Sequence, residues 1–198
     1  MIMTKRKSIF LIISAIILVL IIALSSFLSF KILNNNKTYK YLEQISASYP
    51  YFTADELKEN ADLIVIGKFV KKKGYSKVSE KDKEKFAYEV FTNYQIKVSK
   101  VIKGEADKYI NLRQPGGPID DKTFVMSSNN VEFKNGQKYL LYLRKVQNSI
   151  DDKEVDSYVL ELGECSVFEI NKENKLLLKG EKEEDAKKIT ELYESALD

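Results

Sequence analysis

The chain has 198 residues, which is enough for one domain and little more. Its 32 Lys+Arg, 29 Asp+Glu and 44% hydrophobic residues are typical of a folded protein and exclude a disordered or strongly basic chain. The sequence has no histidine and one cysteine, Cys165, which excludes a histidine-dependent catalytic triad, a His-ligated metal site and an intrachain disulfide.

The first predicted element is an apolar segment, residues 8–30, that contains no charged residue. About 20 such residues in a helix cross the core of a bilayer, so we expect a single transmembrane anchor. Lys5, Arg6 and Lys7 precede the segment and Lys31 follows it. The cationic cluster favours a cytoplasmic N-terminus, residues 1–7, and a domain outside the cell.

A cleaved signal peptide is the alternative interpretation of the same segment. Ala23 and Ser25 place small residues at the spacing of a cleavage site, which would release a secreted chain starting near Ser26. The apolar run continues through Phe30, which is longer than a usual signal core and favours the uncleaved anchor. Both interpretations export the rest of the chain.

The charge of the exported part differs from that of the whole chain. Four of the 32 cationic residues lie at the apolar segment, which leaves 28 against 29 acidic residues, a net charge of about −1. Nucleic-acid binding is therefore not expected, because it depends on an excess of positive charge.

A spacer, residues 31–52, is expected between the anchor and the domain. Within it, Leu42, Ile45 and Tyr49 have the spacing of one face of a short helix that Pro50 ends.

The predicted domain, residues 53–198, opens with a helix. Thr53 and Glu56 have the spacing of a capping box, so the helix is expected to run to about Ala61. Residues 63–70 are rich in β-branched side chains and predict a buried strand. The lysine-rich stretch 71–85 predicts an exposed hairpin or a mobile loop.

Further short strands and a final helix follow. A bulge is expected before Val101, Pro115 to Pro118 are expected to end a strand, and a polar loop is expected before Lys134. The predicted strands are 86–101, 109–113, 139–143, 158–160, 166–170 and 176–178. The helix from about Glu183 places Ala186, Ile189, Tyr193 and Ala196 or Leu197 on one stripe. This pattern predicts a mainly β fold with flanking helices, a small closed barrel of the OB type.

Several short motifs, in order, resemble a known family. Residues 61–68 (ADLIVIGK), 94–98 (YQIKV), 101–104 (VIKG) and 135–141 (NGQKYLL) are similar to the netrin-like, TIMP-like OB domains. They also resemble uncharacterised membrane-anchored proteins of Gram-positive bacteria. The resemblance implies a barrel and a tendency to bind proteins. The animal inhibitors chelate a protease zinc through an N-terminal cysteine, and this chain has no equivalent, so that mechanism does not carry over.

The least ordinary stretch of the sequence is Arg113, Gln114, Pro115, Gly116, Gly117 and Pro118. Two interpretations are open. As a rigid loop with exposed backbone and a guanidinium group, it would bind a peptide or a carboxylate. As a strand end with a glycine turn, it would have only a structural role.

The sequence gives weaker evidence for the other candidate sites. Asp120, Asp121 and the acidic run 151–156 lack the spacing of a calcium loop and are interpreted as solvated turns, so we expect no metal site and no cofactor. Cys165 has no histidine base and is expected to be a buried structural thiol. Most of the twelve tyrosines are expected to pack in the barrel.

These observations together predict a membrane-anchored, extracytoplasmic, non-catalytic binding module. Its expected partners are the bilayer, through residues 8–30, and another envelope protein, for example a protease. The alternatives are a module that recognises cell-wall glycan and, less favoured, a carboxylate-dependent hydrolase.

Overall fold

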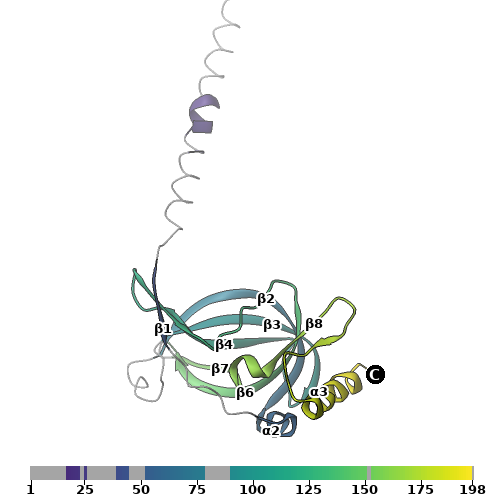
Figure 1. Cartoon of the computed structure of the whole chain (residues 1–198). Coiled ribbons are helices and arrows are strands. Elements are labelled where there is room, and N and C mark those ends of the chain that lie inside the picture. The colour runs from purple at the N-terminus through teal and green to yellow at the C-terminus, as the bar shows by residue number, and fades with distance from the viewer. Residues whose placement is uncertain are drawn as a thin grey trace, which may run out of the picture. The chain divides into compact units, whose positions relative to one another are not determined.

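The computed structural model describes residues 17–22, 25, 39–44, 52–78, 90–150 and 153–197 (Figure 1). Two compact units divide the chain, residues 1–39 and residues 40–198. Residues 17–22 of the first unit are helical. Within the described residues, no helix is both long enough and apolar enough to cross a membrane. Most of the predicted anchor, 8–30, lies outside the described residues, so the anchor stays a prediction.

The second unit is mainly β, as the sequence predicts, with one helix before its long strands and one after them (Figure 1). In chain order its elements are β1 (Lys40–Gln44), α2 (Ala54–Asn60), β2 (Leu63–Lys77), β3 (Val90–Lys103), β4 (Tyr109–Pro118), β5 (Thr123–Ser127), β6 (Lys138–Ile150), β7 (Lys153–Leu160), the 3₁₀ turn η2 (Gly163–Ser166), β8 (Val167–Ile170), β9 (Leu176–Leu177) and α3 (Glu183–Ser195).

Five strands pair in a cycle. β2 pairs with β3 and β3 with β4, both antiparallel. β4 pairs with β7 in parallel, β7 pairs with β6 and β6 pairs with β2, both antiparallel. The pairings therefore return to β2. β8 and β9 extend the sheet from β6, while β5 and β1 extend it from β4.

Four register shifts between β2 and β3 bend these long strands. On β3 one shift skips Ser99, which confirms the bulge expected before Val101. On β2 the shifts skip Val70 and Lys73. β2 runs on to Lys77 and pairs antiparallel with the start of β3, so residues 71–77 form the exposed-hairpin alternative of the prediction, and the mobile-loop alternative is wrong for them. Residues 79–85 of that prediction, and residues 86–89 of the next predicted strand, lie outside the described residues.

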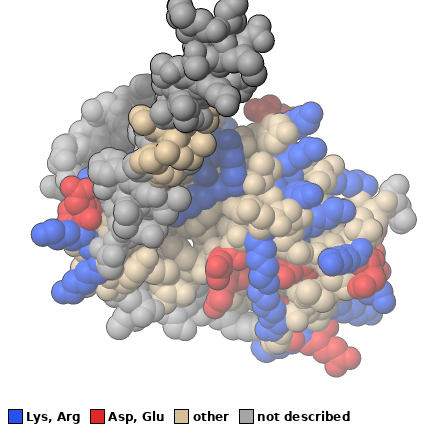
Figure 2. Space-filling view, turned by 90° about the horizontal axis from the view of Figure 1, so that it is seen from above, with Lys and Arg blue, Asp and Glu red and all other residues tan. Residues whose placement is uncertain are grey.

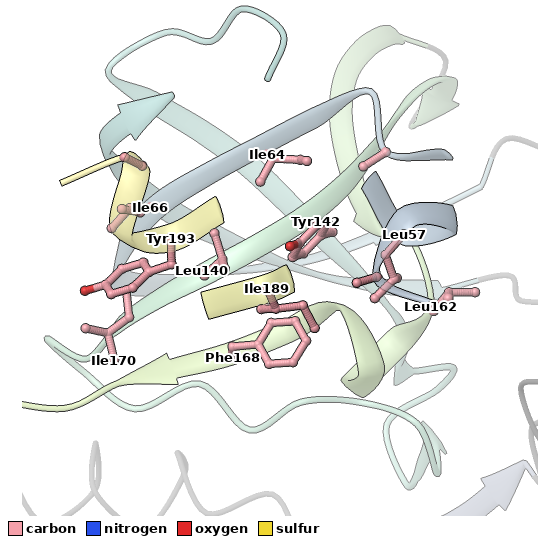
Figure 3. Close-up of a cluster of buried hydrophobic side chains, with 13 residues drawn as sticks. Leu57, Ile64, Ile66, Leu140, Tyr142, Leu162, Phe168, Ile170, Ile189 and Tyr193 are labelled. Atoms are coloured by element: carbon pink, nitrogen blue, oxygen red, sulfur yellow. The ribbon is translucent and has the colours of Figure 1, made fainter. Parts of the chain in front are cut away.

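The alternation of side chains along the strands creates two buried clusters. The first lies among the strands of the cycle and includes Val65, Ile96 and Leu141. The second lies on the opposite face of β2, β6 and β8, where α2 and α3 cover it (Figure 3). On β6, Leu141 and Tyr142 are neighbours in sequence and belong to different clusters, as the two-residue period of a strand requires.

Polar contacts fix the start of α2 and join it to α3. The capping box is confirmed: the Glu56 N–H donates to Thr53 Oγ1 at 3.2 Å, and the Thr53 N–H donates to Glu56 Oε2 at 2.8 Å. From α3, buried Asp185 accepts the N–H of Ala54 at 2.7 Å. The predicted stripe of α3 is confirmed at Ile189, Tyr193 and Ala196, which are buried, whereas Ala186 is partly buried and Leu197 is exposed.

Two segments differ from the predicted elements. Residues 40–44 form β1 and not a helix, because they pair in parallel with β5. Ile45, Tyr49 and Pro50, which complete the helix prediction, lie outside the described residues. Residues 123–127, predicted as part of a polar loop, form β5, which pairs with both β4 and β1. In both cases a neighbouring strand satisfies the backbone, an interaction that local residue preferences do not encode.

Candidate functional site

The six residues singled out by sequence, Arg113 to Pro118, lie in a strand and not in a loop. β4 continues through them, which corrects the prediction that Pro115 ends it. Pro115 is opposite Phe91 of β3, and Gly116 to Pro118 pair with β5. Proline donates no ladder hydrogen bond, and Pro115 lies where β4 passes from pairing with β3 to pairing with β5.

The first three of these residues line a cavity of about 280 Å³ beside β4. Arg113 is 1% exposed, and its guanidinium carbon lies 5.6 Å from the centre of the Phe91 ring. Burial lowers the pKa of Arg113 to about 10, so the group stays protonated at neutral pH. Arg144 and Glu161 lie on the same cavity, with Arg144 Nε 3.6 Å from Glu161 Oε2.

Gln114 has a structural role within the cavity wall. Its Nε2 donates to the Val131 carbonyl at 2.9 Å, and its Oε1 accepts the Val131 N–H at 2.6 Å. Asn130 Nδ2 donates to the Pro115 carbonyl at 2.6 Å. These bonds hold the segment after β5 against β4. The binding role predicted for Arg113 to Pro118 stays a prediction.

The two glycines of this stretch are explained by close approach of neighbouring atoms, from backbone at Gly116 and from side chains at Gly117. Gly116 has φ of 107°, and a Cβ there would lie 2.5 Å from the Val125 carbonyl oxygen. At Gly117 a Cβ would lie 2.5 Å from Val90 Cγ1. Both positions therefore favour glycine for reasons of packing.

A larger groove, about 690 Å³, lies between α2, the C-terminal end of β3 and α3. Its apolar lining comes from Ile64, Val101, Ile102, Leu192 and Ala196. Val101 is 37% exposed and contributes apolar surface to the groove. The sequence analysis missed this groove, because its walls come from three segments far apart in the chain, around residues 55–59, 100–103 and 192–196.

Positive charge predominates at the rim of this groove. Lys58, Lys100 and Lys103 line it together with Asp55 and Glu59. Asp55 is paired with Lys188 of α3, whose Nζ lies 2.7 Å from Asp55 Oδ2. Lys103 Nζ donates to the carbonyls of Lys58 and Glu59 at the end of α2, at 2.7 and 2.9 Å. The groove thus joins an apolar floor to a basic rim.

A cluster of aromatic rings is exposed where β1, β2 and β5 meet. The ring centres of Tyr41 and Phe124 are 5.5 Å apart, and those of Tyr75 and Phe124 are 5.7 Å apart. Lys72 Nζ lies 4.2 Å from the centre of the Tyr75 ring. Tyr41 is 64% exposed and Tyr75 is 42% exposed, so two rings present a surface to solvent.

The remaining candidates have local roles or lie outside the described residues. Cys165 is exposed, so the prediction of a buried thiol is wrong, and desolvation raises its pKa. Asp120 Oδ1 accepts the N–H groups of Lys122 and Thr123, both at 2.7 Å, which lowers the Asp120 pKa. The described residues contain no metal-ligating cluster. Asp151 and Asp152 lie outside them.

No protein-family model matches this chain, and a search of curated proteins found no match.

Proposed function

We propose that this chain is a membrane-anchored binding module, with an apolar N-terminal segment in the bilayer and an OB-like, TIMP-like barrel outside the cell. In this proposal the domain is not an enzyme, and its site is the groove between α2, β3 and α3. The ligand is an amphipathic segment of another envelope protein.

The barrel is supported by the cycle of strand pairs. Its order, β2-β3-β4-β7-β6, combines antiparallel neighbours with one parallel pair, β4 with β7. Five strands in a closed or nearly closed barrel are what an OB-type fold requires. The anchor is supported by the uncharged run 8–30 and by the basic residues that precede it.

The observation that carries the proposal is the pairing of apolar floor and basic rim in one groove. A groove of about 690 Å³ with exposed Val101 is large enough to take several side chains of a partner. Lys58, Lys100 and Lys103 favour acidic residues flanking the apolar ones. A partner segment with this pattern would bury the valine and neutralise the rim.

The test is photo-crosslinking in cells of the full-length chain with a photo-reactive residue in place of Val101. We expect capture of one dominant envelope protein. Leu178 offers a matched control, because it is also 37% exposed but does not line the groove. A reactive residue there should not capture the same protein.

A second variant tests whether the groove supplies affinity. Val101→Asp places a negative charge on the floor and is expected to weaken binding of the captured protein at least tenfold. Leu178→Asp should leave the binding unchanged. Equal capture from both positions, or unchanged affinity in Val101→Asp, would contradict the proposal.

The aromatic cluster supports a second candidate, recognition of cell-wall glycan. Sugar rings stack on exposed aromatic faces, and Tyr41 and Tyr75 offer two. If the same capture returns only wall fragments, and if Tyr75→Ala abolishes retention on purified wall material, glycan recognition replaces protein binding as the function.

A further inference from the structure

β2 and β3 have a charge composition unlike that of the whole chain. These strands, of 15 and 14 residues, contain eight lysines and no acidic residue. The chain as a whole carries 32 cationic and 29 acidic residues. The near-neutral total therefore conceals a strongly basic region.

Cross-strand pairing places several of these lysines on one outer face. In one row, Lys68 is opposite Lys97, which is opposite Tyr109. In the next row, Lys71 is opposite Gln95, which is opposite Asn111. Lys73 Nζ donates to Asn111 Oδ1 at 2.9 Å. We call this set the lysine face: Lys68, Lys71, Lys73, Gln95, Lys97, Tyr109 and Asn111. Figure 2 views the domain from the side on which β2 lies in Figure 1, and cationic side chains predominate there over acidic ones.

Among the residues that the structure describes, the lysines of this face lie next to one another and have no acidic partner. Lys68 and Lys97 are direct cross-strand neighbours, and like charges in that position destabilise a sheet. Within the described part of the chain, no carboxylate lies at ion-pair distance from Lys68, Lys71 or Lys97. Lys188 of α3, by contrast, pairs with both Asp55 and Glu184. An anionic ligand would relieve the repulsion on the lysine face.

We propose that the lysine face docks the domain onto the anionic phospholipid headgroups of the bilayer that holds the anchor. This inference rests on the anchor of the proposed function. Residues 31–39 separate the apolar run from β1, and nine residues span at most about 30 Å. A tether this short keeps the domain close to the headgroups at a high effective concentration, so weak contacts suffice.

Amphipathic side chains beside the lysines favour a bilayer surface over a soluble polyanion. Tyr109 is 45% exposed in the row of Lys68 and Lys97, and Val70, at a bulge next to Lys71, is 37% exposed. Tyrosine is enriched at membrane interfaces, where its ring enters the apolar boundary and its hydroxyl stays hydrated. Lysine stems cover apolar surface while their ammonium groups reach phosphates.

The test uses the full-length chain reconstituted into vesicles, with a tryptophan as reporter. The chain contains no tryptophan, so Tyr109→Trp introduces a single indole on the lysine face. Brominated lipids quench that fluorescence only on contact. We expect strong quenching in vesicles that contain phosphatidylglycerol, little in phosphatidylcholine alone, and loss of quenching at about 1 M NaCl, where the Debye length is about 3 Å. Leu177→Trp, on β9 and 42% exposed, is the control reporter and should stay unquenched.

Charge variants then assign the effect to these lysines. In the Tyr109→Trp chain, the triple change Lys68→Glu, Lys71→Glu and Lys97→Glu is expected to abolish quenching, since each lysine near an anionic surface contributes about fivefold to partitioning. The matched control, Lys172→Glu, Lys175→Glu and Lys179→Glu, changes the net charge equally away from the face and should retain quenching. Circular dichroism checks that both variants fold.

The outcomes separate this inference from the proposed function. If neutral vesicles do not retain the chain, it lacks the anchor. The proposed membrane-anchored function and the docking of the lysine face then both fail. A retained chain whose Tyr109→Trp reporter gives the same signal with and without phosphatidylglycerol overturns the docking alone. Quenching of both reporters to the same extent also overturns it. The docking proposal is also overturned if the lysine face binds soluble polyphosphate when the chain is in neutral vesicles, and if phosphatidylglycerol in the vesicles does not prevent that binding.

Discussion

At the scale of single residues, burial and backbone geometry decide what the unusual stretch Arg113 to Pro118 does. Gln114 is 2% exposed and bonds Val131 through both ends of its amide. Gly116 and Gly117 allow β4 to approach β5 and Val90. Within this stretch, Arg113 is the charged residue that lines the cavity, and its guanidinium is buried. If an Arg113→Ala chain loses binding, its free energy of unfolding must therefore be measured as well, because the change removes a buried side chain.

Gly116→Ala tests the packing explanation of this stretch. Its Cβ would lie 2.5 Å from the Val125 carbonyl oxygen at φ of 107°, so β4 and β5 would have to separate. Gly74 is the control, because its φ is 126° and nothing lies within 4 Å of a Cβ there. We expect urea unfolding to show that Gly116→Ala is destabilised by about 1–3 kcal/mol more than Gly74→Ala. Equal losses would mean that backbone strain alone selects glycine at position 116.

At the scale of elements, α2 and α3 act as one unit on the outer face of the sheet. Leu57 from α2 and Ile189 from α3 share one buried cluster with Tyr142 of β6 (Figure 3). Asp185 extends from α3 to the N-terminal end of α2, where the helix dipole and a free N–H both favour a carboxylate. The same two helices form walls of the proposed groove.

Asp185→Ala tests this link between the helices. It removes the acceptor of the buried Ala54 N–H, and an unsatisfied buried donor costs about 1–3 kcal/mol. We expect urea unfolding to show a loss of that size, with a smaller loss in Asp185→Asn, which keeps an acceptor oxygen. If Asp185→Ala were as stable as the natural chain, the Asp185–Ala54 hydrogen bond would contribute nothing to the packing of α2 on α3.

At the scale of the whole molecule, the proposals give different surfaces to different partners. The groove would take a protein segment, the lysine face would take lipid headgroups, and residues 31–39 would limit the distance between domain and bilayer. Docking of the lysine face and the limit on its distance from the bilayer depend on whether residues 8–30 stay attached to the domain.

N-terminal sequencing of the chain recovered from the membrane fraction tests that attachment. We expect the uncleaved N-terminus, because the apolar run continues past the small residues Ala23 and Ser25 as far as Phe30. A mature chain that starts near Ser26 would contradict the anchor, and with it the proposal that the lysine face docks on the same membrane.

Local signals in the sequence determined a large part of the domain by themselves. The capping box of Thr53 and Glu56, the buried strand at 63–70, the bulge before Val101 and the stripe of α3 each depend on a few adjacent residues, and all four are present. Side-chain periodicity and hydrogen bonds between near neighbours act over these short distances, so they can be read without knowing the fold.

The other elements and the surfaces were decided only by the tertiary structure, because they depend on contacts between residues that are distant in sequence. β1 and β5 are strands since each pairs with another strand, and Pro115 lies inside β4 since β5 continues the pairing beyond it. The groove joins Val101 to Leu192, and the lysine face joins Lys68 to Lys97. Before folding, these residues are ordinary exposed lysines and aliphatic residues of separate segments. Pairing of β2 with β3 and packing of α3 bring them onto common surfaces.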